Sequence, residues 1–329
     1  MFRTLVFIFI VLVPLMGFSQ KLEKRTVKLT YLRKPLRPLD RSTFQTYNCS
    51  LFRGFLEIPD ERRLVERHLK LEGFRRVFSD GDLHIELIMK GLNLQAKARE
   101  SDEDDGLRTN FRYRVQYSFP AVLVLRSRSG KQIDRVPIQE PGEPLEVVFG
   151  QSENFPTPSA LERAWRQRRY EFLAEEEMRQ VNRTFSEVRR LLSDRYSLQT
   201  ATDKIKIAWG SGPYNYDDLE KAADLAQEGY LQLTLKNRDE GEKNLRAAIE
   251  IWLEAIREAN LDKRRSRINK KITRWLHHNC ANAYLWCREF EQARIHNRQA
   301  SSLGLVLNPL SDEFINDLEA RYLANRQTD

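Results

Sequence analysis

The chain has 329 residues, which is more than one typical domain needs and enough for two. Hydrophobic residues make up 41% of the sequence, which excludes a wholly disordered chain because packed cores can form. The net charge of +8 at pH 7 favours anionic partners such as phosphate-bearing glycolipids, acidic proteins or nucleic acid, without selecting one of them.

The N-terminus has the layout of a secretory signal peptide. Arg3 precedes an apolar run, residues 5–18, and the small residue Ser19 stands before a polar sequence. Pro14 interrupts the run, which is shorter than the roughly 20 residues that span a bilayer. The ending "FSQ" resembles signal peptides of Bacteroidetes-type bacteria. We therefore expect a signal peptide, residues 1–20, to be removed, so that the mature protein begins near Gln20 or Lys21. The protein is then exported, periplasmic or extracellular, with no membrane span after cleavage, which argues against nucleic acid as a partner.

Residues 21–209 predict an α+β domain. Stretches such as "TVKLTYL", "LHIELIM" and "NFRYRVQYSFP" alternate in the manner of strands, and "SDGD" is typical of a hairpin turn. A long helix is expected from about Thr157 to Tyr196, started either by Thr157 with Pro158 or by a capping box, Ser159 to Glu162. These elements predict a mainly antiparallel sheet covered by helices.

Residues 210–216 have the composition of a linker, so we expect the domain boundary there. From residue 217 to residue 329 apolar residues recur three and four positions apart, which predicts an all-α domain.

The stretch "ANAYLWCREFEQARIHNRQA" resembles a tetratricopeptide repeat, a helix–turn–helix unit that stacks into arrays. Small and aromatic packing positions of the repeat are matched by Ala281, Tyr284, Phe290, Ala293 and Ala300. "AAIEIWLEA" resembles the second helix of an earlier copy, with Ala248, Trp252 and Ala255 in register. Arg288 and His277 depart from the usual glycine and tryptophan of the repeat. The resemblance implies a short helical repeat domain with a capping helix at 311–325, which binds partners rather than catalysing a reaction.

A cluster of histidines and cysteines in the same region is interpreted as core. Cys280 and Cys287 share a helix face with apolar residues and lie roughly 10 Å apart along one helix, too far for a disulfide. A zinc site that adds His277 and His296 would match no standard ligand spacing. We therefore expect no catalytic residue, no metal site and no cofactor.

The other face of the same helix is the expected partner-binding surface. The resemblance places this face in the concave groove of the repeat array, where a protein or peptide would bind. Broad apolar anchors and amide groups suit recognition, and the residues concerned are Trp275, His278, Asn279, Asn282 and Trp286. The alternative is that the tryptophans pack against the neighbouring domain or the capping helix.

A basic segment, 263–274, is a second candidate surface. It could bind an anionic envelope polymer through Lys263, Arg264, Arg265, Arg267, Lys270, Lys271 and Arg274. The alternative is a solvated loop and helix face.

These observations favour a non-enzymatic adaptor or scaffold of the bacterial cell envelope that binds a protein or peptide in a groove. Two alternative hypotheses are an envelope hydrolase with its site at the domain junction and a polyanion-binding protein that uses the basic segment.

Overall fold

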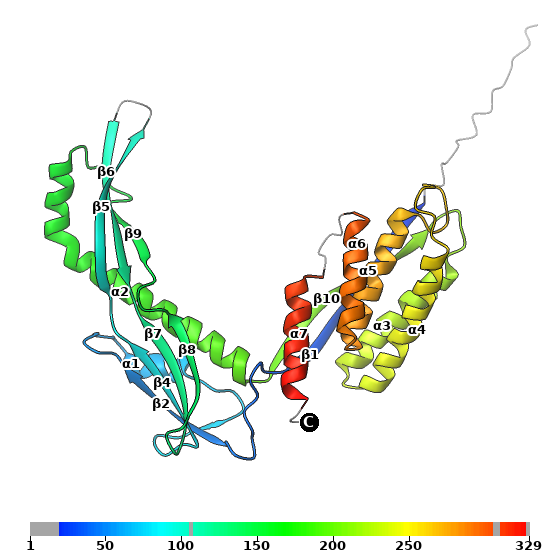
Figure 1. The fold of residues 1–329 in the computed structure, drawn as a ribbon, viewed down its shortest axis with the longest axis horizontal. Helices are drawn as coiled ribbons and strands as arrows, with labels where there is room; N and C mark the ends of the chain where they lie inside the picture. The colour runs from blue at the N-terminus through cyan, green and yellow to red at the C-terminus, as the bar shows by residue number, and fades with distance from the viewer. Residues whose placement is uncertain (1–19, 105–107, 305–309, 327–329) are drawn as a thin grey trace, which may run out of the picture. The chain divides into compact units, whose positions relative to one another are not determined.

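The computed structural model describes residues 20–104, 108–304 and 310–326 (Figure 1). The expected signal peptide, apart from Gln20, lies outside these residues. The chain is α+β, with antiparallel sheets and helices first and a run of helices, α3–α7, afterwards. Within the described ranges no helix combines the length and the hydropathy that crossing a membrane requires.

The chain forms two compact units. The sheet unit consists of residues 33–199 and the chain from residue 321, and the helical unit consists of the chain up to residue 32 and residues 200–320. We expected the boundary at residues 210–216 instead. The difference arises because the first and last strands, β1 (Lys21–Arg33) and β10 (Gln199–Ser211), pair with each other and bury their apolar side chains among the helices.

The sheet unit contains a five-stranded sheet in the order β3-β2-β4-β7-β8. Its strands are β2 (Thr46–Phe52), β3 (Arg75–Arg76), β4 (Leu83–Met89), β7 (Ala121–Ser127) and β8 (Gln132–Gln139). β4, β7 and β8 pair antiparallel, whereas β2 is parallel to β3 and β4. A parallel pair needs a crossover connection, and the chain between β2 and β4 supplies it with the helix α1 (Glu61–His68).

A three-stranded antiparallel sheet, in the order β5-β6-β9, completes this unit. Its strands are β5 (Asn93–Asp104), β6 (Arg108–Ser118) and β9 (Leu145–Phe149). The 39-residue helix α2 (Pro158–Tyr196) packs Trp165 against this sheet and Phe185 against the five-stranded sheet. Of the two predicted starts of α2, the structure has the first, because the Thr157 hydroxyl accepts a hydrogen bond from the Ala160 N–H.

In the helical unit, helices that follow one another along the chain pack together as pairs, α3 with α4 and α5 with α6. Its helices are α3 (Asp217–Thr234), α4 (Arg238–Arg257), α5 (Lys270–Trp286), α6 (Phe290–Ser302) and α7 (Asp312–Asn325). β1 and β10 run antiparallel, because Thr30 contacts Thr202 near one end and the Ser211 hydroxyl donates to Glu23 at the other, each at 3.0 Å. We call these two strands the ribbon.

α7 contributes to both units, since its last turns belong to the sheet unit. There the Arg321 guanidinium donates to the carbonyls of Lys34 and Asp194 at 2.8 and 3.1 Å. In the helical unit, Arg294 of α6 donates to Asn316 of α7 at 2.9 Å. The predicted capping helix is therefore present, and it is bonded to α6.

The pairs α3–α4 and α5–α6 are joined by the same turn. Lys236 and Arg288, which stand 52 positions apart, both adopt a left-handed backbone, with φ of 65° and 63°. The same backbone hydrogen bonds close each turn. Small residues recur with the same shift of 52 positions, as Gly229 with Ala281 and Gly241 with Ala293. The two helix pairs are therefore copies of one structural unit.

Close approach of α3 and α4 explains why Gly229 is glycine. A Cβ at this position would lie 2.9 Å from Leu245 Cγ and 3.0 Å from the Gly241 carbonyl oxygen. Alanine normally stabilises a helix interior by about 1 kcal/mol relative to glycine. Here the contact reverses the sign, and Gly229→Ala should lower the free energy of unfolding by about 1–2 kcal/mol.

Chemical denaturation of the two proteins measures this effect. Lys221→Ala, at an exposed position of the same helix, is the control and should change stability by less than about 0.5 kcal/mol. A more stable Gly229→Ala protein would contradict the packing described.

Candidate functional site

The tryptophan face of α5 is buried. Its five residues, Trp275, His278, Asn279, Asn282 and Trp286, are only 2–9% exposed. Trp275 packs with Ala208 of β10, and the Trp286 ring meets the Tyr31 ring of β1 at a centroid distance of 4.6 Å. The ribbon covers both tryptophans, and both contacts are made with residues of the stretch 21–209 that was predicted to form the neighbouring domain.

Asn279 holds the ribbon on α5. Its side-chain N–H donates to the Ala208 carbonyl at 2.7 Å, and its side-chain oxygen accepts from the Ala208 N–H at 3.2 Å. The amide thus satisfies both backbone groups of a fully buried strand residue, as a neighbouring strand would. Asn282, in contrast, donates to the His278 carbonyl within its own helix.

Removing the Asn279 amide should therefore destabilise the protein. In Asn279→Ala both backbone groups of Ala208 lose their partners, and we expect the free energy of unfolding to fall by about 2–4 kcal/mol. Asn282→Ala is the matched control, and its effect should be about 1 kcal/mol or less. Equal effects in a denaturant titration would show that Asn279 does not have this role.

His278 makes the stability of the helical unit depend on pH. Burial, with a smaller contribution from the charge of Lys206, lowers the pKa of His278 to about 4. The unfolded chain takes up this proton near pH 6.5, whereas the folded imidazole resists it until about pH 4. The free energy of unfolding should therefore be constant above about pH 6.5 and decrease as the pH falls from there towards 4.

Between pH 7 and 4.5 the contribution of His278 amounts to roughly 2–3 kcal/mol. Denaturant titrations across this range should show a shallower pH dependence for His278→Gln than for the parent chain. Parallel curves for the two proteins would rule out His278 as the titrating group. Burial also lowers the pKa of His277 to about 4, so part of the dependence should remain in the variant.

The cysteines of this region lie in the core, as predicted. Cys280 and Cys287 belong to the main apolar cluster of the helical unit, and burial raises the pKa of Cys287 to about 12. His277 and His296 face each other, with 2.9 Å between their Nδ1 atoms. Across the described ranges, no group of three or more histidine, cysteine or carboxylate side chains is placed to hold a metal ion.

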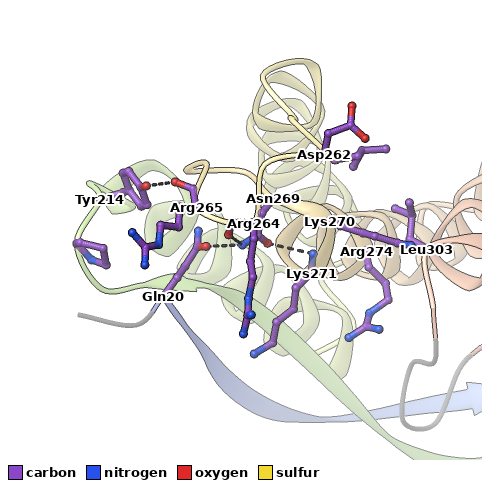
Figure 2. A pocket seen from close by; sticks show the side chains of 12 residues that line it. Gln20, Tyr214, Asp262, Arg264, Arg265, Asn269, Lys270, Lys271, Arg274 and Leu303 are labelled. Atoms are coloured by element: carbon purple, nitrogen blue, oxygen red, sulfur yellow. Dashed lines mark hydrogen bonds between the residues drawn. The ribbon is translucent and has the colours of Figure 1, made fainter. Parts of the chain in front are cut away.

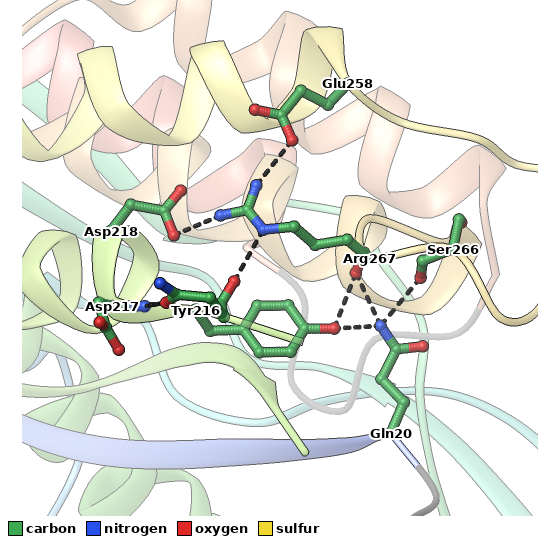
Figure 3. A network of polar contacts seen from close by, with 8 residues as sticks. Gln20, Tyr216, Asp217, Asp218, Glu258, Ser266 and Arg267 are labelled. Carbon is green, nitrogen blue, oxygen red and sulfur yellow. Dashed lines mark hydrogen bonds and ion pairs between the residues drawn. The ribbon is translucent and has the colours of Figure 1, made fainter. Parts of the chain in front are cut away.

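The basic segment divides into two kinds of cation. Arg267 is structural: it forms ion pairs with Asp218 and, at 2.7 Å, with Glu258, and it donates to the Asn215 carbonyl at 2.8 Å (Figure 3). Its guanidinium also lies over the Tyr216 ring. Arg267 is therefore removed from the predicted anion-binding set.

The loop before α5 is held by side chains that bond its carbonyls. Asn269 donates to the carbonyl of residue 264 at 2.9 Å, and the Tyr214 hydroxyl donates to that of residue 265. Gln20 donates to the carbonyls of residues 266 and 267 at 3.0 and 2.7 Å (Figure 3). The carbonyl oxygens of residues 264–267 thus already accept hydrogen bonds. They are therefore not available to bind the cationic side chains of the loop, and those side chains determine the local charge.

A pocket of about 1030 Å³ lies beside this loop and the start of α5 (Figure 2). Its cationic lining residues are Arg264, Arg265, Lys270, Lys271 and Arg274. Within the described part of the chain none of these five forms an ion pair, and Asp262 is the one acidic residue among those described as lining the pocket. Lys263 belongs to the basic segment but does not line the pocket.

One further feature favours an anion here. The N-terminus of α5 contributes partial positive charge, although the Asn269 side chain already accepts from the Lys271 and Ile272 N–H groups. The pocket can therefore hold negative charge, but with Asp262 as its single carboxylate it does not assemble the pair of acids that glycoside hydrolysis uses.

The three residues that hold the loop, Gln20, Tyr214 and Asn269, were not among the predicted site residues. Asn269 could have been found, because an asparagine directly before a helical pattern is a capping signal. Gln20 was assigned to the signal peptide, and nothing in the spacing of Tyr214 connects it with residue 265.

Comparisons with known proteins give no family for this chain: no family model matches it, and no curated protein matches it. Among the solved structures similar to it are two bacterial lipoproteins. A minor lipoprotein from Acinetobacter baumannii has 11% identity and a TM-score of 0.21, with 48% of this chain and 96% of that chain covered. An uncharacterized lipoprotein B from Nitrosomonas europaea has 10% identity and a TM-score of 0.20, with 48% and 87% covered.

Proposed function

We propose that this protein is an exported, non-enzymatic binding protein of the bacterial cell envelope that holds an anionic envelope molecule in the basic pocket of its helical unit. The observation that carries the proposal is the gathering of five cations around one pocket, with no ion pair to any of them within the described residues. Arg267, in the same segment, has two acidic partners. Arg267 is thus paired with acidic residues of the fold, whereas the five cations that line the pocket have no such partner within the described residues.

The fixed loop supports a binding role over a merely solvated one. A solvated loop would direct its carbonyls to water, whereas the carbonyls of residues 264 and 265 are bonded by Asn269 and Tyr214. In a mature chain that begins at Gln20, the carbonyls of residues 266 and 267 are bonded as well. A loop held in this way loses little conformational freedom when a ligand binds. Exposed charge pairs contribute about 0.2–1 kcal/mol each, so five cations together support at most about 5 kcal/mol, which corresponds to a dissociation constant no tighter than about 0.2 mM for a small multivalent anion at low salt.

We further propose that α3–α6 are two tetratricopeptide-like copies, which the shared turn and the 52-residue shift of small residues support. An adaptor that captures a partner on Trp275 and Trp286 is less well supported, because the ribbon covers both side chains. No feature described in either unit favours the envelope hydrolase. The polyanion-binding alternative is therefore the one we retain.

Neutralising two pocket cations should weaken anion binding. We expect the double variant Arg264→Gln, Lys271→Gln to bind inorganic pyrophosphate about 2- to 30-fold more weakly than the parent chain, from the loss of two charge pairs. Isothermal titration calorimetry at low salt measures the affinity, and circular dichroism checks that the fold is kept.

Lys263→Gln is the matched control, since it removes one charge from the same loop outside the pocket. It should bind pyrophosphate nearly as well as the parent chain. If all three proteins bind equally, or if none binds, the basic pocket is not the site.

A further inference from the structure

The pocket cations are arranged as a row rather than as a ring. Figure 2 shows Arg265, Arg264, Lys271 and Arg274 following one another across the pocket, with Arg264 and Lys271 extending in the same direction. Arg264 and Arg265 come from the loop, whereas Lys271 and Arg274 are three positions apart and so share a face of α5. Lys270 points away from this row, towards Leu303 (Figure 2).

A row of like charges is unfavourable unless the fold imposes it. Here the loop carrying Arg264 and Arg265 is fixed by bonds to its backbone carbonyls, and Lys271 and Arg274 are fixed by the helix. Lys271 Nζ and the Arg264 guanidinium extend to the same side with no carboxylate between them, since Asp262 points to the opposite side (Figure 2). A bound ligand that places negative groups along the row relieves this repulsion at every position.

The size of the pocket also argues against a single small anion. Its volume of about 1030 Å³ is at the upper end of the roughly 300–1,000 Å³ that is usual for sites of drug-sized ligands. One phosphate would contact the middle of the row and leave Arg265 and Arg274, at its two ends, without a partner. An extended ligand would contact all four cations of the row.

Three of the four side chains in the row are arginines, which favours phosphate among anionic groups. The two non-bridging oxygens of a phosphate match the forked N–H donors of a guanidinium, and arginine is over-represented where phosphate is bound in this way. We propose that the ligand is an extended chain bearing successive phosphate groups, which lie on Arg265, Arg264, Lys271 and Arg274 in turn. This inference rests on the proposed anion-binding function and adds the class and shape of the ligand.

Chain length is the decisive variable in the test. Inorganic phosphate, pyrophosphate, tripolyphosphate and long-chain polyphosphate are titrated into the intact protein. Affinity should rise about 2- to 30-fold from pyrophosphate to the long chain, because about two further charge pairs form. For about four contacts, the logarithm of the long-chain affinity should fall with the logarithm of salt concentration with a slope of about −3.

The variant Arg265→Gln separates the row from a compact site. Arg265 stands at one end of the row and its side chain is exposed. Its loss should weaken the long chain about threefold or more, the value of one charge pair, while pyrophosphate binding stays nearly unchanged. Lys263→Gln should affect neither ligand.

The outcomes distinguish the two proposals. If pyrophosphate binds at the pocket but chain length and Arg265→Gln have no effect, the row is not the binding mode and only this inference fails. If poly-glutamate of the same charge binds as tightly as polyphosphate, the phosphate assignment is wrong. If no phosphate compound binds, the proposed function fails as well.

Discussion

The bonds between the Asn279 side chain and Ala208 fix the ribbon on α5, and the helical unit depends on that docking. The ribbon closes the tryptophan face, and its residues Val27, Leu29, Ile205 and Ile207 complete the apolar core that the helices begin. An asparagine serves here because one side-chain amide can both donate to and accept from one backbone residue. An apolar side chain at this position would leave two buried backbone groups of Ala208 without partners.

The same docking connects the ribbon with the basic pocket. Gln20 stands directly before β1, so the position of that strand determines whether its amide reaches the carbonyls of the loop before α5. Once those carbonyls are occupied, the negative ends of the loop peptides no longer compete with an incoming anion for the cations. The pocket is therefore positive for a structural reason that lies in another part of the chain, and not only because basic residues are frequent there.

The fold class could be predicted from the sequence because alternation and helical spacing are local signals. The start of α2 was among two predicted alternatives, and the burial of Cys280 and Cys287 followed from the geometry of one helix. The docking of β1 and β10 was not predictable in this way, because alternation shows which face of a strand is buried but not which element covers it. The tryptophan face shows the same limit: helical spacing identified one face of α5 correctly, but the strands that cover it are remote in sequence.

The basic segment was recognised from composition, but its division was not. Arg267 differs from Arg264 and Arg265 through its ion pairs with Asp218 and Glu258, and Asp218 lies 49 positions away. Pairing between positions so far apart leaves no trace in one sequence. Local capping at Asn269, in contrast, is readable, and it is the one element of the loop's support that the spacing alone could have shown.

The ribbon also constrains how the chain folds. β1 is made first, but its partner β10 follows only after the 165 residues between Arg33 and Gln199. During that interval an apolar, unpaired strand would be prone to associate with other chains. β1 carries five cations, Lys21, Lys24, Arg25, Lys28 and Arg33, and one carboxylate, Glu23, and the net positive charge on an open strand edge opposes such association. The lysines and arginines of β1 are therefore placed where their charge would oppose association of a strand whose partner has not yet been synthesised.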